Sequence, residues 1–251
     1  MFQIKGKVAL LVGPCRGVCC EITRQLLQNH VRVVVIAEPI NEVGKIQVQK
    51  LKDEFGEMRI YLLQVDILNP KELESVYLTT IKLFDHLDIV INNVGTIDES
   101  DIDRNMTLTT ITAMRSTKLA VNVYLPQHKL GTEGVVINVN CVVSLGNTPN
   151  LLTGLSGLTA GNQYERNNIR VISLFLGVSQ PEILGGLMTS QLVQTISNIP
   201  DLRIQPGLES AGRALIGAIE QGVNGSSWVG VRQSVPESLI QGNWSLSQMR
   251  L

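Results

Sequence analysis

The feature of this sequence that most constrains its fold is an end-to-end alternation of strand-length apolar runs with segments of helical periodicity. The run Val8–Val12 is apolar at every position, which is typical of a strand buried on both faces. Repeated strand–helix–strand crossovers of one hand build a single parallel sheet that is covered by helices on both sides. The alternation therefore predicts an α/β fold with a doubly wound parallel sheet.

About seven strands are expected in this sheet. They are Val8–Val12, Val31–Ala37, Arg59–Val65, Leu87–Ile91, Val135–Val139, Ile169–Phe175 and Ser227–Val231. Helices are expected between them, because apolar residues recur there at helical spacing or because Pro70 suits a first helical turn. They are the segment marked by Val18, Ile22 and Leu26, then Asn41–Phe55, the segment from Pro70 to Phe84, Asp101–Tyr124, Thr153–Asn167, and the segment marked by Ala211, Leu215, Ala218 and Ile219.

The composition predicts one globular domain over residues 1–251, with a polar C-terminal tail from about residue 234. Hydrophobic residues make up 44% of the chain and charged residues 17%, which is enough apolar material for a large core. The net charge of −1 and the lack of a basic run argue against a nucleic-acid or membrane-surface partner. The short, mixed segment Met1–Lys7 is no secretory signal, and the four cysteines resemble no disulfide framework, so a cytoplasmic location is expected.

A glycine-containing turn follows the first expected strand and opens the first expected helix. Gly13 and Gly17 stand in this turn, where backbone N–H groups and the helix N-terminus can hold a pyrophosphate. Glu38 ends the second strand, where an acidic side chain can accept hydrogen bonds from an adenosine ribose. The turn and the acid together predict a dinucleotide site.

Several segments in the correct order resemble short-chain dehydrogenases/reductases. Val-Gly-Pro-Cys-Arg-Gly, ending at Gly17, resembles the glycine-rich loop of that family, and Asp66 matches its adenine-contacting Asp. Asn-Asn-Val-Gly, ending at Gly95, resembles its N-N-A-G motif, and the stretch from Asn168 to Gly177 resembles its sixth strand and the following turn. The similarity extends roughly from Gly6 to Val231. The stretches Gly95–Arg104 and Asn224–Trp228 particularly resemble those of insect alcohol dehydrogenases and 15-hydroxyprostaglandin dehydrogenases. The resemblance implies a Rossmann-like sheet.

The resemblance also implies a set of cofactor-binding residues. These are Gly13, Gly17, Glu38, Asp66, Asn93 and Gly95. NAD is expected rather than NADP, because Glu38 would repel a 2′-phosphate. Cys19 replaces the third glycine of the loop and Val94 replaces an alanine, so both add bulk near the cofactor. We therefore expect NAD binding to be weak.

The catalytic residues that the resemblance implies are missing. The family uses a tyrosine as general acid/base and a lysine four residues later, whose charge lowers the pKa of the phenol. The residues four positions after the four tyrosines are Val65, Ile81, His128 and Asn168. By counting from the neighbouring motifs, the asparagine, serine, tyrosine and lysine of the family fall on Thr109, Cys141, Gly154 and Leu158. No catalytic residue is assigned.

This loss favours a non-enzymatic role. The former substrate cleft would be lined by apolar groups and suit a small lipophilic ligand such as a retinoid, terpenoid or fatty acid. The lining residues would be Cys141, Leu151, Leu152, Leu155 and Leu158. The alternative is an NAD-dependent alcohol or ketone oxidoreductase that uses other groups, with the Cys141 thiol as one candidate. A weaker alternative is a structural or storage protein whose cleft has collapsed.

A homodimer is the expected assembly. In the resembling family the helices corresponding to Asp101–Tyr124 and Thr153–Asn167 pack against their symmetry mates, and no charged residue stands between Thr153 and Gln163. The second segment contains three glycines, which lower helix propensity, so the alternative is that this segment is not a helix. The tail from Ser234 could cover either the cleft or a partner subunit. Three scattered histidines lack ligand spacing, so no metal site is expected.

Overall fold

The computed structural model describes residues 1–39, 41–95, 101–141, 164–176 and 208–230, and in them one seven-stranded sheet. Its strand order is β3-β2-β1-β4-β5-β6-β7, and every pairing is parallel. The strands are β1 Val8–Val12, β2 Val33–Glu38, β3 Ile60–Gln64, β4 Ile89–Asn92, β5 Gly134–Cys141, β6 Ile169–Leu176 and β7 Ser227–Gly230. The order reverses between β1 and β4, as in a doubly wound sheet.

The helices join these strands in the expected sequence. They are α1 Val18–Gln28, α2 Glu42–Phe55, η1 Glu57–Arg59, α3 Pro70–Phe84, α4 Ile102–Met106, η2 Thr107–Ile111, α5 Thr112–Leu119, η3 Ala120–Tyr124, α6 Leu125–His128, α8 Tyr164–Asn167 and α11 Glu209–Gln221. Of the expected helix Thr153–Asn167, only α8 falls within the described residues, and the tail from residue 234 lies outside them.

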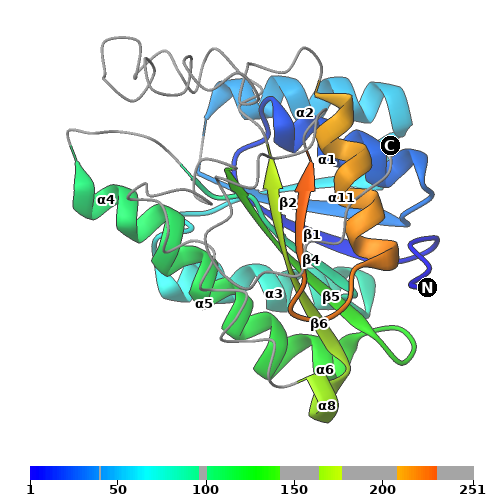
Figure 1. Ribbon diagram of the computed structural model, residues 1–251. Helices are drawn as coiled ribbons and strands as arrows, with labels where there is room; N and C mark the ends of the chain where they lie inside the picture. Colours follow the sequence, from blue (N-terminus) through cyan, green and yellow to red (C-terminus); the bar gives the residue numbers. More distant parts are fainter. Residues whose placement is uncertain (40, 96–100, 142–163, 177–207, 231–251) are drawn as a thin grey trace, which may run out of the picture.

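Two apolar clusters lie on opposite faces of the sheet. One holds Ala9 and Leu11 against α1, α2 and α11, and the other holds Leu10 and Val12 against α3 and α5. Figure 1 shows these helices as two layers with the sheet between them. Successive strand residues point to opposite faces, so a strand that is covered twice must be apolar throughout. This requirement explains the uninterrupted apolar run Val8–Val12.

Most of the expected element boundaries are confirmed to within two residues. The second strand begins at Val33 rather than Val31, because His30 adopts a positive φ of 63° and the Val31 N–H donates to the Leu26 carbonyl. Val31 therefore belongs to the turn that follows α1 and not to β2. The long helix continues beyond Tyr124 and runs without a break from Ile102 to His128.

Two π turns interrupt this long helix. The N–H of Thr112 donates to the carbonyl of Thr107, and that of Leu125 donates to the carbonyl of Ala120. Each bond spans five residues instead of four, and such turns occur often at functional sites. The first turn, η2, contains Thr109, the position that corresponds to the catalytic asparagine of the resembling family.

A buried carboxylate ties the strands together at their amino ends. Asp88 is fully buried before β4 and accepts hydrogen bonds from the backbone N–H groups of Val8 and Leu130. Lys7 supplies the compensating charge, with its Nζ 3.2 Å from Asp88 Oδ1. A buried ion needs such partners to offset its loss of hydration.

At the opposite edge, β1 and β4 end in two loops that touch through their backbones. A Cβ atom added at Gly13 would lie 2.0 Å from the Asn93 carbonyl oxygen, and Gly13 has a φ of 136°. The Asn93 N–H donates to the Val12 carbonyl at 2.9 Å. Only glycine allows both this conformation and this approach.

We predict that Gly13→Ala lowers the free energy of unfolding by about 3 kcal/mol, since backbone strain and overpacking each cost roughly 1–3 kcal/mol. Gly6→Ala is the matched control, because Gly6 has a φ of 79° but no atom within 4 Å of an added Cβ. It should cost about 1 kcal/mol. Urea denaturation measures both, and equal losses would show that the approach to Asn93 does not matter.

Candidate functional site

The six residues expected to bind a cofactor follow four adjacent strands at one edge of the sheet. Gly13 and Gly17 follow β1, Glu38 ends β2, Asp66 follows β3, and Asn93 and Gly95 follow β4. Because the strands are parallel and in register, their carboxyl ends meet at this edge. This is where an open α/β sheet binds its ligands.

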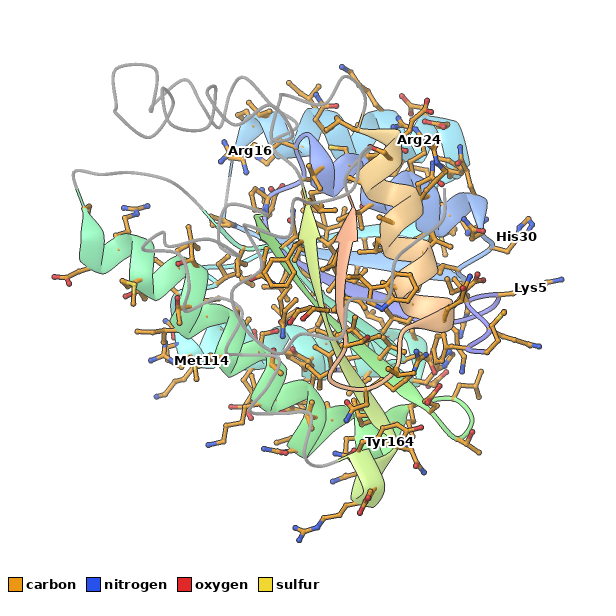
Figure 2. The ribbon with its side chains drawn as sticks, viewed as in Figure 1. Lys5, Arg16, Arg24, His30, Met114 and Tyr164 are labelled. Carbon is orange, nitrogen blue, oxygen red and sulfur yellow. The ribbon has the colours of Figure 1, made fainter. Side chains whose placement is uncertain are left out.

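The turn after β1 leaves the N-terminus of α1 without a side-chain cap. Gly17 precedes the helix with a φ of 48°, and no side chain accepts from the first helical N–H groups. The Cys19 N–H donates to the Arg16 carbonyl, and the lack of a side-chain cap together with the helix dipole favours an anion at this end. Arg16 is exposed in the same turn and adds positive charge (Figure 2). These features fit the pyrophosphate of a dinucleotide.

Cys19 stands at the position where the glycine-rich loop of the resembling family has its third glycine. Its side chain is fully buried, with Sγ 3.8 Å from the Gly13 carbonyl oxygen. Val94, the other bulky replacement, is also buried. Both side chains therefore pack into the core of the protein.

Glu38 ends β2 as expected, but its carboxylate points inward. Its Oε2 accepts hydrogen bonds from the Cys15 N–H at 2.8 Å and from Asn41 Nδ2 at 3.1 Å. The side chain is fully buried, and its Oε1 has no hydrogen-bond partner. In this conformation the carboxylate holds the glycine turn from inside, and a ribose could reach it only if the side chain moved.

A glycine in the first turn of α2 makes room for this carboxylate. A Cβ atom added at Gly44 would lie 1.8 Å from Glu38 Oε1. The Gly44 N–H donates to Asn41 Oδ1, so Asn41 caps α2 and binds Glu38 at the same time. The presence of a glycine inside an otherwise regular helix was the only sequence signal for this arrangement.

The other expected residues lie at the surface of the same edge. Asp66 is exposed, and its Oδ1 accepts from the Leu68 N–H at 3.0 Å. Gly95 is exposed as well, and a Cβ atom added there would lie 3.7 Å from Thr109 Cγ2. The structure thus places Thr109 beside the Asn-Asn-Val-Gly motif, as the counting from Gly95 predicts.

The remaining positions that correspond to catalytic residues are only partly described. Cys141 is the last residue of β5, paired with Leu176 of β6, at the same carboxyl edge. Gly154 and Leu158, like Leu151, Leu152 and Leu155, lie outside the described residues.

All four tyrosines are described, and each hydroxyl has a partner away from the carboxyl edge or inside the core. Tyr164 lies just before β6, at the amino edge (Figure 2), and the hydrogen bond to Glu133 raises its pKa. Burial and Glu74 raise the pKa of Tyr124 to about 12. Burial also raises the pKa of Tyr77, and the Tyr61 hydroxyl contacts Met58 Sδ. A general base needs the opposite shift.

A buried polar network, which the sequence analysis did not identify, joins α3 and α5 to the centre of the sheet. Asn92 Nδ2 donates to Asn138 Oδ1 at 2.8 Å, and Ser116 Oγ donates to Asn92 Oδ1. The Tyr77 hydroxyl contacts Ser116, and Thr117 Oγ1 donates to Asn138 Oδ1 at 3.0 Å. The first Asn of the Asn-Asn-Val-Gly motif therefore has a structural role. Two asparagines inside apolar strands were the available signal.

A model of the short chain dehydrogenase family matches residues 7–188. The chain belongs to the short-chain dehydrogenase family. An alcohol dehydrogenase-related 31 kDa protein of Drosophila lebanonensis is 24% identical over all of this chain and 97% of its own length. Fat body protein 2 of Drosophila melanogaster is 22% identical over 98% of this chain and all of its own length.

Solved structures show the same fold at low sequence identity. A proposed dehydrogenase of Burkholderia cenocepacia with bound NADP has a TM-score of 0.76 and 15% identity, over 93% of this chain and 96% of that one. A short-chain type dehydrogenase/reductase of Mycobacterium ulcerans has a TM-score of 0.75 and 15% identity, over 91% and 89%. The doubly wound sheet predicted from the sequence is confirmed.

Two further findings concern the described part of the chain alone. None of its helices combines the length and the apolar character needed to cross a membrane. Within the same residues, no three His, Cys, Asp or Glu side chains are arranged so that they could hold a metal ion.

The site thus fits one half of a dinucleotide better than the other. The turn and the uncapped α1 fit the pyrophosphate, whereas the buried Glu38 does not face an adenosine ribose. NAD, when bound, would supply the hydride acceptor of the family's chemistry. Contact between Glu38 and the ribose stays a prediction, as do the roles of Asp66, Asn93 and Gly95.

We predict that Glu38→Gln lowers the free energy of unfolding by about 1–3 kcal/mol, because a buried amide loses the charge-assisted bond to Cys15 and leaves donors unpaired beside Gly44. Glu42→Gln is the control, since Glu42 is exposed and pairs only with Lys45 at the surface. It should change stability by less than about 0.5 kcal/mol. Equal effects in urea denaturation would contradict a structural role for Glu38.

Proposed function

We propose that this chain is a catalytically degenerate short-chain dehydrogenase that binds a small lipophilic ligand in the former substrate region and binds NAD weakly. The observation that carries the proposal is the loss of the tyrosine–lysine pair: no tyrosine has a lysine four residues later. The position of Tyr164 at the amino edge and the burial of Tyr77 support it. Hydride transfer to a carbonyl needs a proton donor at the carboxyl edge.

Weak NAD binding follows from two features. The ribose would have to displace Glu38 from its bonds to Cys15 and Asn41. Leu158 replaces the family's ammonium group, and a charge-assisted contact of that kind is worth about 1.5–3 kcal/mol, or roughly tenfold or more in affinity. NAD stays preferred to NADP in this proposal, because an acidic side chain at the end of β2 disfavours a 2′-phosphate.

The lipophilic ligand is inferred from the substitutions at the former catalytic floor. Four leucines, at 151, 152, 155 and 158, and Cys141 replace or surround positions that are polar in an active enzyme. Apolar side chains with few polar groups are typical of sites for lipophilic molecules.

A second candidate function is an NAD-dependent alcohol or ketone oxidoreductase with other catalytic groups. The observation that favours it is the retained glycine turn with the uncapped N-terminus of α1. The Cys141 thiol, at the end of β5, would be its candidate reactive group.

The two candidates predict different behaviour of the purified protein. We expect no turnover of NAD or NADP with simple alcohols, sterols or prostanoid-like substrates, and an NAD dissociation constant above the micromolar range by calorimetry. The absorption spectrum and mass spectrometry of an organic extract should reveal the bound lipophilic molecule. Turnover that disappears in Cys141→Ser, or sub-micromolar NAD affinity, would contradict the proposal and favour the oxidoreductase.

We also propose a two-fold homodimer through the helix that runs from Ile102 to His128. Ile111, Met114 and Val123 expose 39%, 42% and 40% of their surface on this helix, and Figure 2 shows Met114 pointing outward. Apolar side chains grouped on one helix are typical of a self-complementary interface.

Light scattering tests the dimer, which should have twice the chain mass of 27.5 kDa. We expect Met114→Glu to shift the protein towards the monomer, because a charge would be buried at the interface. Met58→Glu is the control, since Met58 is 76% exposed on η1, away from this helix. A wild-type monomer at micromolar concentration would refute the dimer.

A further inference from the structure

Three cysteines gather at the glycine turn, and neither the fold nor the proposed function accounts for them. Cys15 lies in the turn itself, and Cys19 and Cys20 lie in the first turn of α1. The Sγ atoms of Cys15 and Cys20 are 3.4 Å apart, and all three thiols are free. The short distance between the Cys15 and Cys20 sulfurs suits a reaction between these two thiols.

We propose that Cys15 and Cys20 form a reversible disulfide that locks the glycine turn onto the first turn of α1. A disulfide joins its sulfurs at about 2.05 Å, so the two Sγ atoms would need to approach by only about 1.4 Å. The cross-link spans four residues, Arg16 and Gly17 of the turn and Val18 and Cys19 at the start of α1. It forms within this chain and does not depend on whether a nucleotide binds.

The three thiols differ in exposure, and this difference indicates which of them reacts first with an oxidant. Cys15 and Cys19 are fully buried, whereas Cys20 is half-buried and is therefore the thiol that an oxidant can reach. Cys19 Sγ faces the Gly13 carbonyl at 3.8 Å. Cys20 is accordingly the thiol that reacts with the oxidant, and Cys15 is the resolving thiol that then forms the disulfide with it.

Hydrogen peroxide is the oxidant in this scheme. The Cys20 thiolate attacks one peroxide oxygen, the O–O bond breaks, hydroxide leaves, and Cys20 becomes a sulfenic acid. The Cys15 sulfur, after loss of its proton, attacks Cys20 Sγ, and the S–O bond breaks with release of water. Overall, two thiols lose two protons and two electrons, and one peroxide becomes two waters. A dithiol reductant reverses the reaction.

The hydrogen bond to Cys15 and burial raise the pKa of the Cys20 thiol. Little thiolate is therefore present at neutral pH, and cross-linking is slower than for an exposed cysteine. The close approach of the two sulfurs favours the disulfide over further oxidation once the sulfenic acid has formed.

Peptide mapping tests the proposal directly, because trypsin cleaves after Lys7, Arg16 and Arg24. A disulfide between Cys15 and Cys20 joins the peptide of residues 8–16 to that of residues 17–24, and dithiothreitol separates them. We expect this linked pair in the peroxide-treated wild type and in Cys19→Ser, and its loss in Cys20→Ser. Linkage in Cys20→Ser but not in Cys19→Ser would overturn the assignment to Cys20, and sulfinic acid at Cys20 without linkage would overturn the disulfide.

A second measurement uses only the wild-type protein, so its result does not depend on whether a cysteine variant folds. Phenylarsine oxide bridges two thiols whose sulfurs lie close together. One equivalent, added to the folded, reduced wild type, should protect both Cys15 and Cys20 from iodoacetamide that is added after denaturation, whereas both should be alkylated without the arsenical; fragment-ion spectra of the two peptides would show this. Failure to protect both together would contradict the proximity on which the disulfide rests.

Discussion

The structure depends on the burial of its central strands on both faces. Because β1 is covered by α1 and α11 on one side and by α3 and α5 on the other, its residues must be apolar at every position. The same constraint requires each strand to be followed by a crossover helix, which makes all pairings parallel. All carboxyl ends then meet at one edge, where the glycine turn, Glu38 and the Asn-Asn-Val-Gly motif come together.

The strands were predictable because this constraint leaves a strong mark on the sequence. Val8–Val12 is predicted without error, and β2 starts two residues later than predicted because His30, in the turn after α1, has a left-handed conformation. The π turns were not predictable, since a helix with two five-residue bonds keeps no constant period. The network of Asn92 and Asn138 was missed for a related reason: polar residues in an apolar run show that a partner exists but do not say which one.

The candidate site was predictable in position more than in chemistry. The sequence places Gly13, Glu38 and Asn93 at the ends of adjacent strands, and the structure has them there. The orientation of the Glu38 side chain could not be foreseen, because it depends on Gly44, a residue on another element, and on the backbone N–H of Cys15. Side-chain orientation of this kind depends on packing between elements, which local sequence does not encode.

The π turn at Thr107–Ile111 makes this part of the long helix sensitive to a one-residue change in chain length. A π turn holds one residue more than the α turn it replaces, and one residue corresponds to about 100° of rotation around the helix. Deletion of a single residue there would restore regular α geometry and turn α4 by that angle relative to α5. The helix can therefore change the side chain it presents beside Gly95 by a one-residue change in length, while Ser116 and Thr117 keep their contacts with the sheet. In this fold, the residues that border the candidate site can change through chain length as well as through substitution.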